Sequence, residues 1–119
     1  MPPKILLIDD EPDILEFQKA YLSSKGYTIL TAINTNQALD LIKKEPPEIV
    51  FCDIRLERDT SGLDILEEAK RIKPDIIVYL ITGIIDNEIE EKGLSLGAKE
   101  VIRKPIRIEL LEEKIKENL

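Results

Sequence analysis

The 119-residue sequence contains no histidine, and this absence removes two kinds of functional site. Ser-His-Asp and Cys-His catalysis both need an imidazole as general base, and imidazole is the commonest transition-metal ligand. The metal ligands that remain are mainly the carboxylates of aspartate and glutamate. We therefore expect any bound metal to be a hard cation such as Mg²⁺.

Cysteine and long apolar runs are scarce as well. Cys52 is the only cysteine, so no internal disulfide can form, and we expect a reducing, cytoplasmic location. Because Cys52 lies inside an apolar run, it is predicted to pack in the core. The longest apolar stretch, residues 76–85, is interrupted by Thr82 and Gly83, so it cannot span a bilayer. We expect no membrane partner and no signal peptide.

Positive charge is in deficit. The formal net charge is −7 and the sequence pI is near 4.7. This balance argues against direct binding of nucleic acid, which depends on lysine and arginine neutralising phosphates. At this length we expect one domain with a single core.

Five apolar, strand-like segments alternate with five segments whose apolar residues recur at helical spacing. The expected strands cover residues 4–8, 27–32, 48–53, 76–81 and 100–103, and the expected helices begin near residues 12, 35, 62, 86 and 108. The segments 48–53 and 76–81 are almost continuously apolar, as in strands buried on both faces of a parallel sheet. The predicted fold class is α/β, a doubly wound five-stranded parallel sheet with helices on both faces.

Polar residues stand at the ends of four of these strands: Asp9 and Asp10, Asp53, Thr82, and Lys104. In a parallel sheet these ends meet at one edge, where open α/β folds bind their ligands. Clustered carboxylates repel one another unless a cation neutralises them, and Mg²⁺ prefers carboxylate and phosphate oxygens. A carboxylate beside a metal, a lysine and a hydroxyl therefore favours transfer of a phosphoryl group onto Asp53.

Each of these residues also has a simpler interpretation when it is taken singly. Asp53 can merely end a strand and cap the next turn, and Asp9 and Asp10 can be charges at a helix N-terminus. Thr82 can be a strand-end hydroxyl and Lys104 an ordinary surface lysine. Three aromatic side chains are predicted to lie in the core: Phe17, Tyr21 and Tyr79.

Together the strand-end residues resemble the signature of the response-regulator receiver domain of two-component signalling, over the whole chain and in the right order. The motifs are Asp9-Asp10, Asp53, Thr82-Gly83 and Lys104-Pro105. The resemblance implies a flavodoxin-like strand order of 2-1-3-4-5. It also implies that residues 1–119 form one receiver domain, with no output domain in this chain.

The resemblance further implies that Asp53 accepts a phosphoryl group from a sensor histidine kinase or a phosphotransfer protein. The missing histidine would then come from this partner. Thr82 and Lys104 would bind the phosphoryl group, and the bond between Lys104 and Pro105 would be cis, which only X-Pro bonds adopt at low cost. The chain would be a switch and not an enzyme with a separate substrate, catalysing only its own phosphotransfer and autodephosphorylation.

By the same match, Asp10, Asp53 and the backbone carbonyl of Arg55 would hold Mg²⁺, and Asp9 would act through water. A downstream effector would read the face formed by helix 86–96, strand 100–103 and the last helix. The chain is expected to be a monomer that can dimerise on phosphorylation.

Three features depart from the commonest pattern of that family. The loop after Asp53 is one residue longer and lacks its proline, so we expect it to be mobile and to pack differently. Val101 stands where an aromatic residue often swings inward, so output is expected to depend on Thr82 and the following loop. Arg55 is expected to place its side chain beside the acceptor and to modulate the lifetime of the phosphate.

Two other functions stay open from the sequence. One is a small hydrolase that works through an aspartyl phosphate, which the short chain disfavours because it leaves no room for a lid or a substrate pocket. The other is a receiver-like interaction module that works without phosphorylation, which the complete set of acidic residues disfavours.

Overall fold

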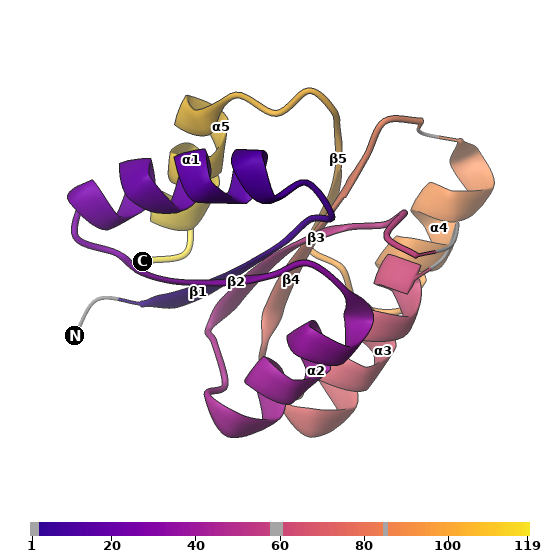
Figure 1. The fold of residues 1–119 in the computed structure, drawn as a ribbon. Coiled ribbons are helices and arrows are strands. Elements are labelled where there is room, and N and C mark those ends of the chain that lie inside the picture. Colours follow the sequence, from indigo (N-terminus) through magenta and orange to yellow (C-terminus); the bar gives the residue numbers. More distant parts are fainter. Residues whose placement is uncertain (1–2, 58–60, 85) are drawn as a thin grey trace.

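The computed structural model describes residues 3–57, 61–84 and 86–119, where five strands alternate with five helices (Figure 1). The strands are β1 (Lys4–Ile8), β2 (Thr28–Ala32), β3 (Ile49–Asp53), β4 (Ile77–Thr82) and β5 (Glu100–Arg103). The helices are α1 (Pro12–Ser24), α2 (Thr35–Lys44), α3 (Ser61–Ile72), α4 (Asn87–Ser95) and α5 (Ile108–Lys116). The strands pair in parallel in the order β2-β1-β3-β4-β5, which confirms the predicted fold and strand order.

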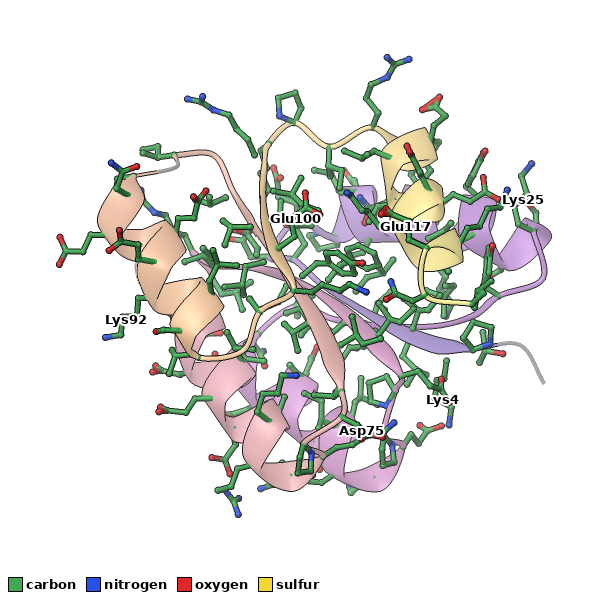
Figure 2. All side chains as sticks on the ribbon, turned by 180° about the vertical axis from the view of Figure 1, so that it is seen from behind. Lys4, Lys25, Asp75, Lys92, Glu100 and Glu117 are labelled. Atoms are coloured by element: carbon green, nitrogen blue, oxygen red, sulfur yellow. The ribbon has the colours of Figure 1, made fainter. Side chains whose placement is uncertain are left out.

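The sheet is covered on both faces, by α1 and α5 on one side and by α2, α3 and α4 on the other (Figure 1). Strand β3 is buried along its whole length, as its apolar sequence predicts. Successive side chains of a strand point to opposite faces, so Leu6 and Ile8 pack against α2 and α3, whereas Ile5 and Leu7 pack against α1 and α5. Figure 2 shows side chains filling both spaces between the sheet and the helices.

Helix α4 forms in spite of Gly93, which lowers its helical propensity. Gly93 is buried, and a Cβ atom there would lie 2.8 Å from Cδ1 of Leu80 on β4. The glycine therefore lets α4 approach the sheet more closely than a larger residue would. Val101 on β5 packs against the same core cluster and is partly buried. The N-terminus of α4 is capped by Asp86, whose carboxylate accepts the Ile89 N–H at 2.8 Å.

The aromatic predictions have a mixed outcome. Tyr79 is buried and stacks on Phe51, with ring centroids 4.9 Å apart and an interplanar angle of 9°. Tyr21 is partly buried against the same cluster. The prediction for Phe17 is wrong, since 60% of that residue is exposed. Phe17 lies at helical spacing on α1, but its ring lines a surface pocket and not the core.

The described helices include none that is both long enough and apolar enough to cross a bilayer. The topology instead directs attention to one edge of the sheet. The carboxyl ends of β1, β3, β4 and β5 meet there, and the chain leaves the central strands β1 and β3 toward opposite edges. This switch point is where open α/β sheets form their binding crevices.

Candidate functional site

Three aspartates gather at the carboxyl edge of the sheet. Asp9 and Asp10 follow β1, and Asp53 is the last residue of β3. One carboxylate oxygen of each lies within 4.8 Å of one from each of the other two. Asp9 and Asp53 are only 8% and 5% exposed, while Asp10 is open to solvent. The sheet thus holds two of the three carboxylates in a buried setting, where like charges repel most strongly.

Lys104 supplies the positive charge of the site. Its Nζ atom lies 2.7 Å from Oδ2 of Asp53 and 3.4 Å from Oδ2 of Asp9. Lys104 follows β5, and its backbone N–H donates to the Thr82 carbonyl at 2.8 Å, so β4 and β5 hold the base of the side chain. The peptide bond between Lys104 and Pro105 is cis. The predicted pair of strand-end charges therefore meets in space, although 51 residues separate them.

Burial and neighbouring charges act in opposite directions on the pKa values of Asp9 and Lys104, and a different one of the two prevails in each case. Burial raises the pKa of Asp9 above its usual value, and the Glu11 N–H and the Lys104 ammonium offset this only in part. Burial alone would lower the pKa of Lys104, but its hydrogen bond to Asp53 and the charges of Asp53 and Asp9 outweigh it and raise the pKa. The ammonium is therefore retained at neutral pH, and the ionised form of Asp9 is held at a cost.

The raised pKa of Asp9 predicts that an Asp9→Asn variant is more stable than wild type in Mg²⁺-free buffer at pH 7. The amide keeps an oxygen for the Glu11 N–H and removes the buried charge. We expect a gain of up to about 1 kcal/mol in the free energy of unfolding, measured by urea denaturation. The penalty applies above the raised pKa and disappears below the usual value of 3.8, so the gain should shrink as the pH falls.

An Asp40→Asn variant is the control for this comparison, because Asp40 is exposed on α2 and pairs only at the surface with Lys44. If Asp9→Asn is no more stable than Asp40→Asn at pH 7, the ionised Asp9 carboxylate is not held at a cost.

Thr82 ends β4 and is 1% exposed. Its hydroxyl donates to the Ile84 carbonyl at 3.0 Å and accepts the Ile84 N–H at 3.3 Å. The hydroxyl is thus bonded to the loop that leads into α4. Ile84 itself is 55% exposed, and its neighbour Ile85 lies outside the described residues.

Arg55 adjoins Asp53 through its main chain. Its N–H donates to Oδ1 of Asp53 at 3.2 Å, which fixes the backbone against the acidic cluster. Its side-chain Nε is buried and has no hydrogen-bond partner among the described residues. The expectation of a mobile loop concerns mainly residues 58–60, which lie outside the described part of the chain.

The donor set fits a hard divalent cation. Three carboxylates converge with no nitrogen or sulfur ligand among them, and carboxylate oxygens are the ligands that Mg²⁺ prefers. Lys104 neutralises only part of this negative charge. Cys52, the neighbour of Asp53, is fully buried, and burial raises the pKa of its thiol far above the usual value, so it remains a protonated core residue as predicted.

Sequence reasoning missed a pocket of about 690 Å³ beside the site. Asp9 and Lys104 form part of its wall, and the rest comes mainly from apolar residues of β1, β3 and β4, of α1, and of the chain from Pro105 into α5. Ile14 and Phe17 contribute from α1, and both are exposed. The helical spacing of Phe17 predicts a core residue, but residues that line a pocket along a helix recur at the same spacing.

Comparison with known proteins supplies independent information. Residues 5–116 match the family model described as the response regulator receiver domain. A CheY-like response regulator receiver domain protein from Methanospirillum hungatei is 32% identical, with a TM-score of 0.92 over 99% of this chain and 94% of that chain. The BeF3-activated DrrB receiver domain is 29% identical, with a TM-score of 0.86 over 98% and 97% of the two chains.

A third similar structure is a response regulator protein from Burkholderia pseudomallei, crystallised with a phosphorylated aspartic acid, a calcium ion and citrate. It is 25% identical, with a TM-score of 0.87 over 98% of this chain and 68% of that chain.

Proposed function

Since this chain belongs to the response regulator receiver domain family, whose members are signalling domains and not conventional enzymes, we propose that it is a switch operated by phosphorylation of Asp53. One observation carries the proposal. The Asp53 carboxylate is buried at the end of the central strand, 2.7 Å from the Lys104 ammonium and beside two further carboxylates. A phosphoryl group on Asp53 would thus meet a fixed cation and a set of metal ligands.

Asp53 is a better acceptor than its two acidic neighbours. Its side chain is ordered at both oxygens, since Oδ1 accepts the Arg55 N–H and Oδ2 accepts from Lys104. Asp9 accepts the Glu11 N–H at 3.0 Å, but its contact with Lys104 is longer than that of Asp53, 3.4 Å against 2.7 Å; Asp10 is exposed. Ordering of the nucleophile lowers the entropic cost of the reaction, which supports Asp53 as the residue that attacks.

The reaction transfers a phosphoryl group between two nucleophiles. The bond from phosphorus to a donor's imidazole nitrogen breaks, and a bond to a carboxylate oxygen of Asp53 forms. Because these 119 residues contain no histidine, the donor imidazole would come from outside them, in agreement with the histidine kinases that partner this family. Lys104 then moves from pairing with the carboxylate to pairing with a phosphoryl oxygen, and hydrolysis of the acyl phosphate resets the switch.

The metal belongs to the same proposal. Asp10, Asp53 and the backbone carbonyl of Arg55 would hold Mg²⁺, and Asp9 would contribute through water. When bound, the ion supplies positive charge that neutralises the cluster and the incoming phosphoryl oxygens. The chain's own part is to hold three carboxylates within reach of one another before the ion arrives.

Beryllofluoride, a mimic of the phosphoryl group, tests this function directly. We expect the wild-type chain to bind it only with Mg²⁺ present, with NMR amide shifts at Asp53, Thr82 and Lys104 and along α4 and β5. No binding at all would favour the interaction module that works without phosphate, and binding that does not depend on Mg²⁺ would contradict the proposed role of the metal.

The output is proposed to depend on Thr82 and the loop that follows it. The Thr82 hydroxyl is bonded to Ile84, so turning it toward a phosphoryl oxygen would release that loop. An effector would read the face of α4, β5 and α5, where Leu94 on α4 and Ile84 beside it are exposed apolar residues. Such residues are suited to a protein partner.

We predict that Thr82→Ala separates phosphate binding from output. The variant should still bind beryllofluoride, but the amide shifts along α4 should fall about tenfold, since a hydrogen bond to a charged acceptor contributes roughly 1.5–3 kcal/mol. Thr82→Ser keeps the hydroxyl and should respond like wild type. A full response from Thr82→Ala would show that output takes another route.

We predict that Arg55→Ala shortens the lifetime of the aspartyl phosphate. The guanidinium begins at a buried Nε that has no described partner, so it can contact the phosphoryl group or obstruct an attacking water. Hydrolysis should accelerate about threefold to tenfold, which corresponds to roughly 1 kcal/mol in the barrier. Decay of the phosphorylated protein, followed by intact mass, measures this rate. Arg103→Ala on the exposed part of β5 is the control, and equal decay in both variants would remove Arg55 from the mechanism.

A further inference from the structure

The loop between Asp53 and α3 begins with residues 54–57. These residues include no proline, which would fix the backbone angle φ, so contacts must hold this part of the loop. At its two ends, the Ile54 N–H donates to Ile81 at 2.9 Å, and the Gly62 N–H donates to Ile54 at 2.8 Å. Leu56 packs against the core cluster on the α2 and α3 side.

A further contact ties the middle of the loop to another element. The carboxylate of Glu57 accepts two hydrogen bonds from Thr35, one from the backbone N–H to Oε1 and one from the hydroxyl to Oε2, each 2.7 Å long. We refer to this pair, Glu57 and Thr35, as the clasp.

The clasp is physically reasonable at both ends. Thr35 is the first residue of α2, and the first N–H groups of a helix have no partner within the helix. The positive end of the helix dipole also favours a carboxylate at this place. Asn34 caps the same helix by accepting the Gln37 N–H at 2.8 Å. The Thr35 N–H is not bonded by this cap, and Glu57 accepts it instead.

The clasp lies close enough in the chain to Asp53 to affect the geometry around it. Glu57 lies two residues after Arg55, whose N–H bonds to Asp53 and whose carbonyl is the proposed metal ligand. The clasp therefore restrains the loop on one side of Arg55, while the Asp53 carboxylate restrains it on the other. Outer contacts that orient a metal ligand commonly change metal affinity when they are removed.

We infer that Glu57 is a positioning residue for the phosphorylation site: by binding Thr35 at the start of α2, it holds the Arg55 main chain against Asp53 and so sets the affinity for Mg²⁺. This inference rests on the proposed function. Glu57 is exposed and buries little surface, so its removal should leave the fold intact and act through the geometry of the loop.

The clasp itself is tested first, without metal, by NMR amide hydrogen exchange. In a Glu57→Gln variant the Thr35 amide should exchange at least about threefold faster, because a hydrogen bond to a charged acceptor is replaced by a weaker one. Unchanged exchange at Thr35 would mean that the clasp is absent in solution and would overturn the inference.

The role of the clasp in metal binding is tested by calorimetric titration with Mg²⁺. The dissociation constant of Glu57→Gln should rise about tenfold, the effect typical of losing an outer contact to a metal site. Thr35→Val should also weaken binding, and Thr35→Ser, which keeps the hydroxyl, should restore it. The double variant should lose less than the sum of the two single losses, because both substitutions weaken the same contact.

A charge control separates geometry from electrostatics. Glu11→Gln removes one negative charge near Asp9 without touching the clasp, and its Mg²⁺ affinity should fall less than that of Glu57→Gln. Equal losses in these two variants, or an unchanged affinity in Glu57→Gln, would overturn the inference alone. Failure of the wild-type chain to bind Mg²⁺ would instead overturn the proposed function and this inference with it.

Discussion

Asp53→Asn is expected to abolish phosphorylation of this chain by a small-molecule donor such as acetyl phosphate. The amide has no anionic oxygen to attack phosphorus, and we expect no neighbour to replace it, because Asp9 lies farther from the Lys104 ammonium than Asp53 does and Asp10 lies in solvent. We expect uptake to fall about 100-fold or more, the scale on which removal of a nucleophile acts. Intact mass after incubation with the donor measures the effect.

Asp40→Asn is the matched control for this loss, because it removes one aspartate charge from the exposed face of α2. Its uptake of phosphate should equal that of wild type. A phosphate adduct on Asp53→Asn at the wild-type level would mean that another residue is the acceptor, and the proposed arrangement of Lys104 around Asp53 would lose its purpose.

Lys104→Met is expected to damage both stability and phosphorylation. The variant leaves the Asp53 carboxylate buried without its cation, and removal of one partner of a buried pair commonly costs about 3–5 kcal/mol. The Lys104 side chain is 29% exposed, so we expect a smaller loss of about 2 kcal/mol in Mg²⁺-free buffer. Added Mg²⁺ should recover part of it by bringing positive charge to the same carboxylates.

The same variant should take up phosphate about 100-fold more slowly, because a fixed cation at the developing charge contributes on this scale. Lys92→Met is the control, since Lys92 projects from α4 away from the sheet (Figure 2). If Lys104→Met and Lys92→Met show the same uptake rate and the same urea midpoint, the pair between Lys104 and Asp53 has no energetic role.

The pH dependence of this loss follows from the raised pKa of Lys104. A base with a raised pKa in the folded state contributes stability that is fully present below its usual pKa, here 10.5. That contribution is lost as the pH rises through the folded-state value. The difference in stability between wild type and Lys104→Met should therefore persist across the neutral range and shrink only in strong alkali.

Much of the fold follows from a simple pattern in the sequence. The runs before Asp9 and Asp53 are apolar enough to be buried on both faces, which implies a parallel sheet. Once strands and helices alternate, the strand ends must share an edge. That rule predicts from the sequence alone that Asp53 and Lys104 lie at the same edge, and the observed 2.7 Å contact agrees with it.

The features that the sequence did not predict depend on how separate elements pack against one another. Phe17 satisfies the helical spacing of a core residue, yet it faces a pocket, because spacing does not reveal whether a neighbouring element covers the stripe. Gly93 reads as a weak point in a helix, although it lets α4 approach Leu80. The bond between Glu57 and Thr35 joins a loop to the first residue of α2, 22 residues earlier in the chain, and no periodic pattern predicts such a contact.

The most direct test of the central claim is to locate the phosphate chemically. Borohydride reduces an aspartyl phosphate to homoserine, so the chain is incubated with acetyl phosphate, reduced, digested and mapped by peptide mass, with and without Mg²⁺. The proposed switch predicts homoserine at position 53 alone, and only when Mg²⁺ is present. Homoserine at Asp9 or Asp10, or none under either condition, would contradict it.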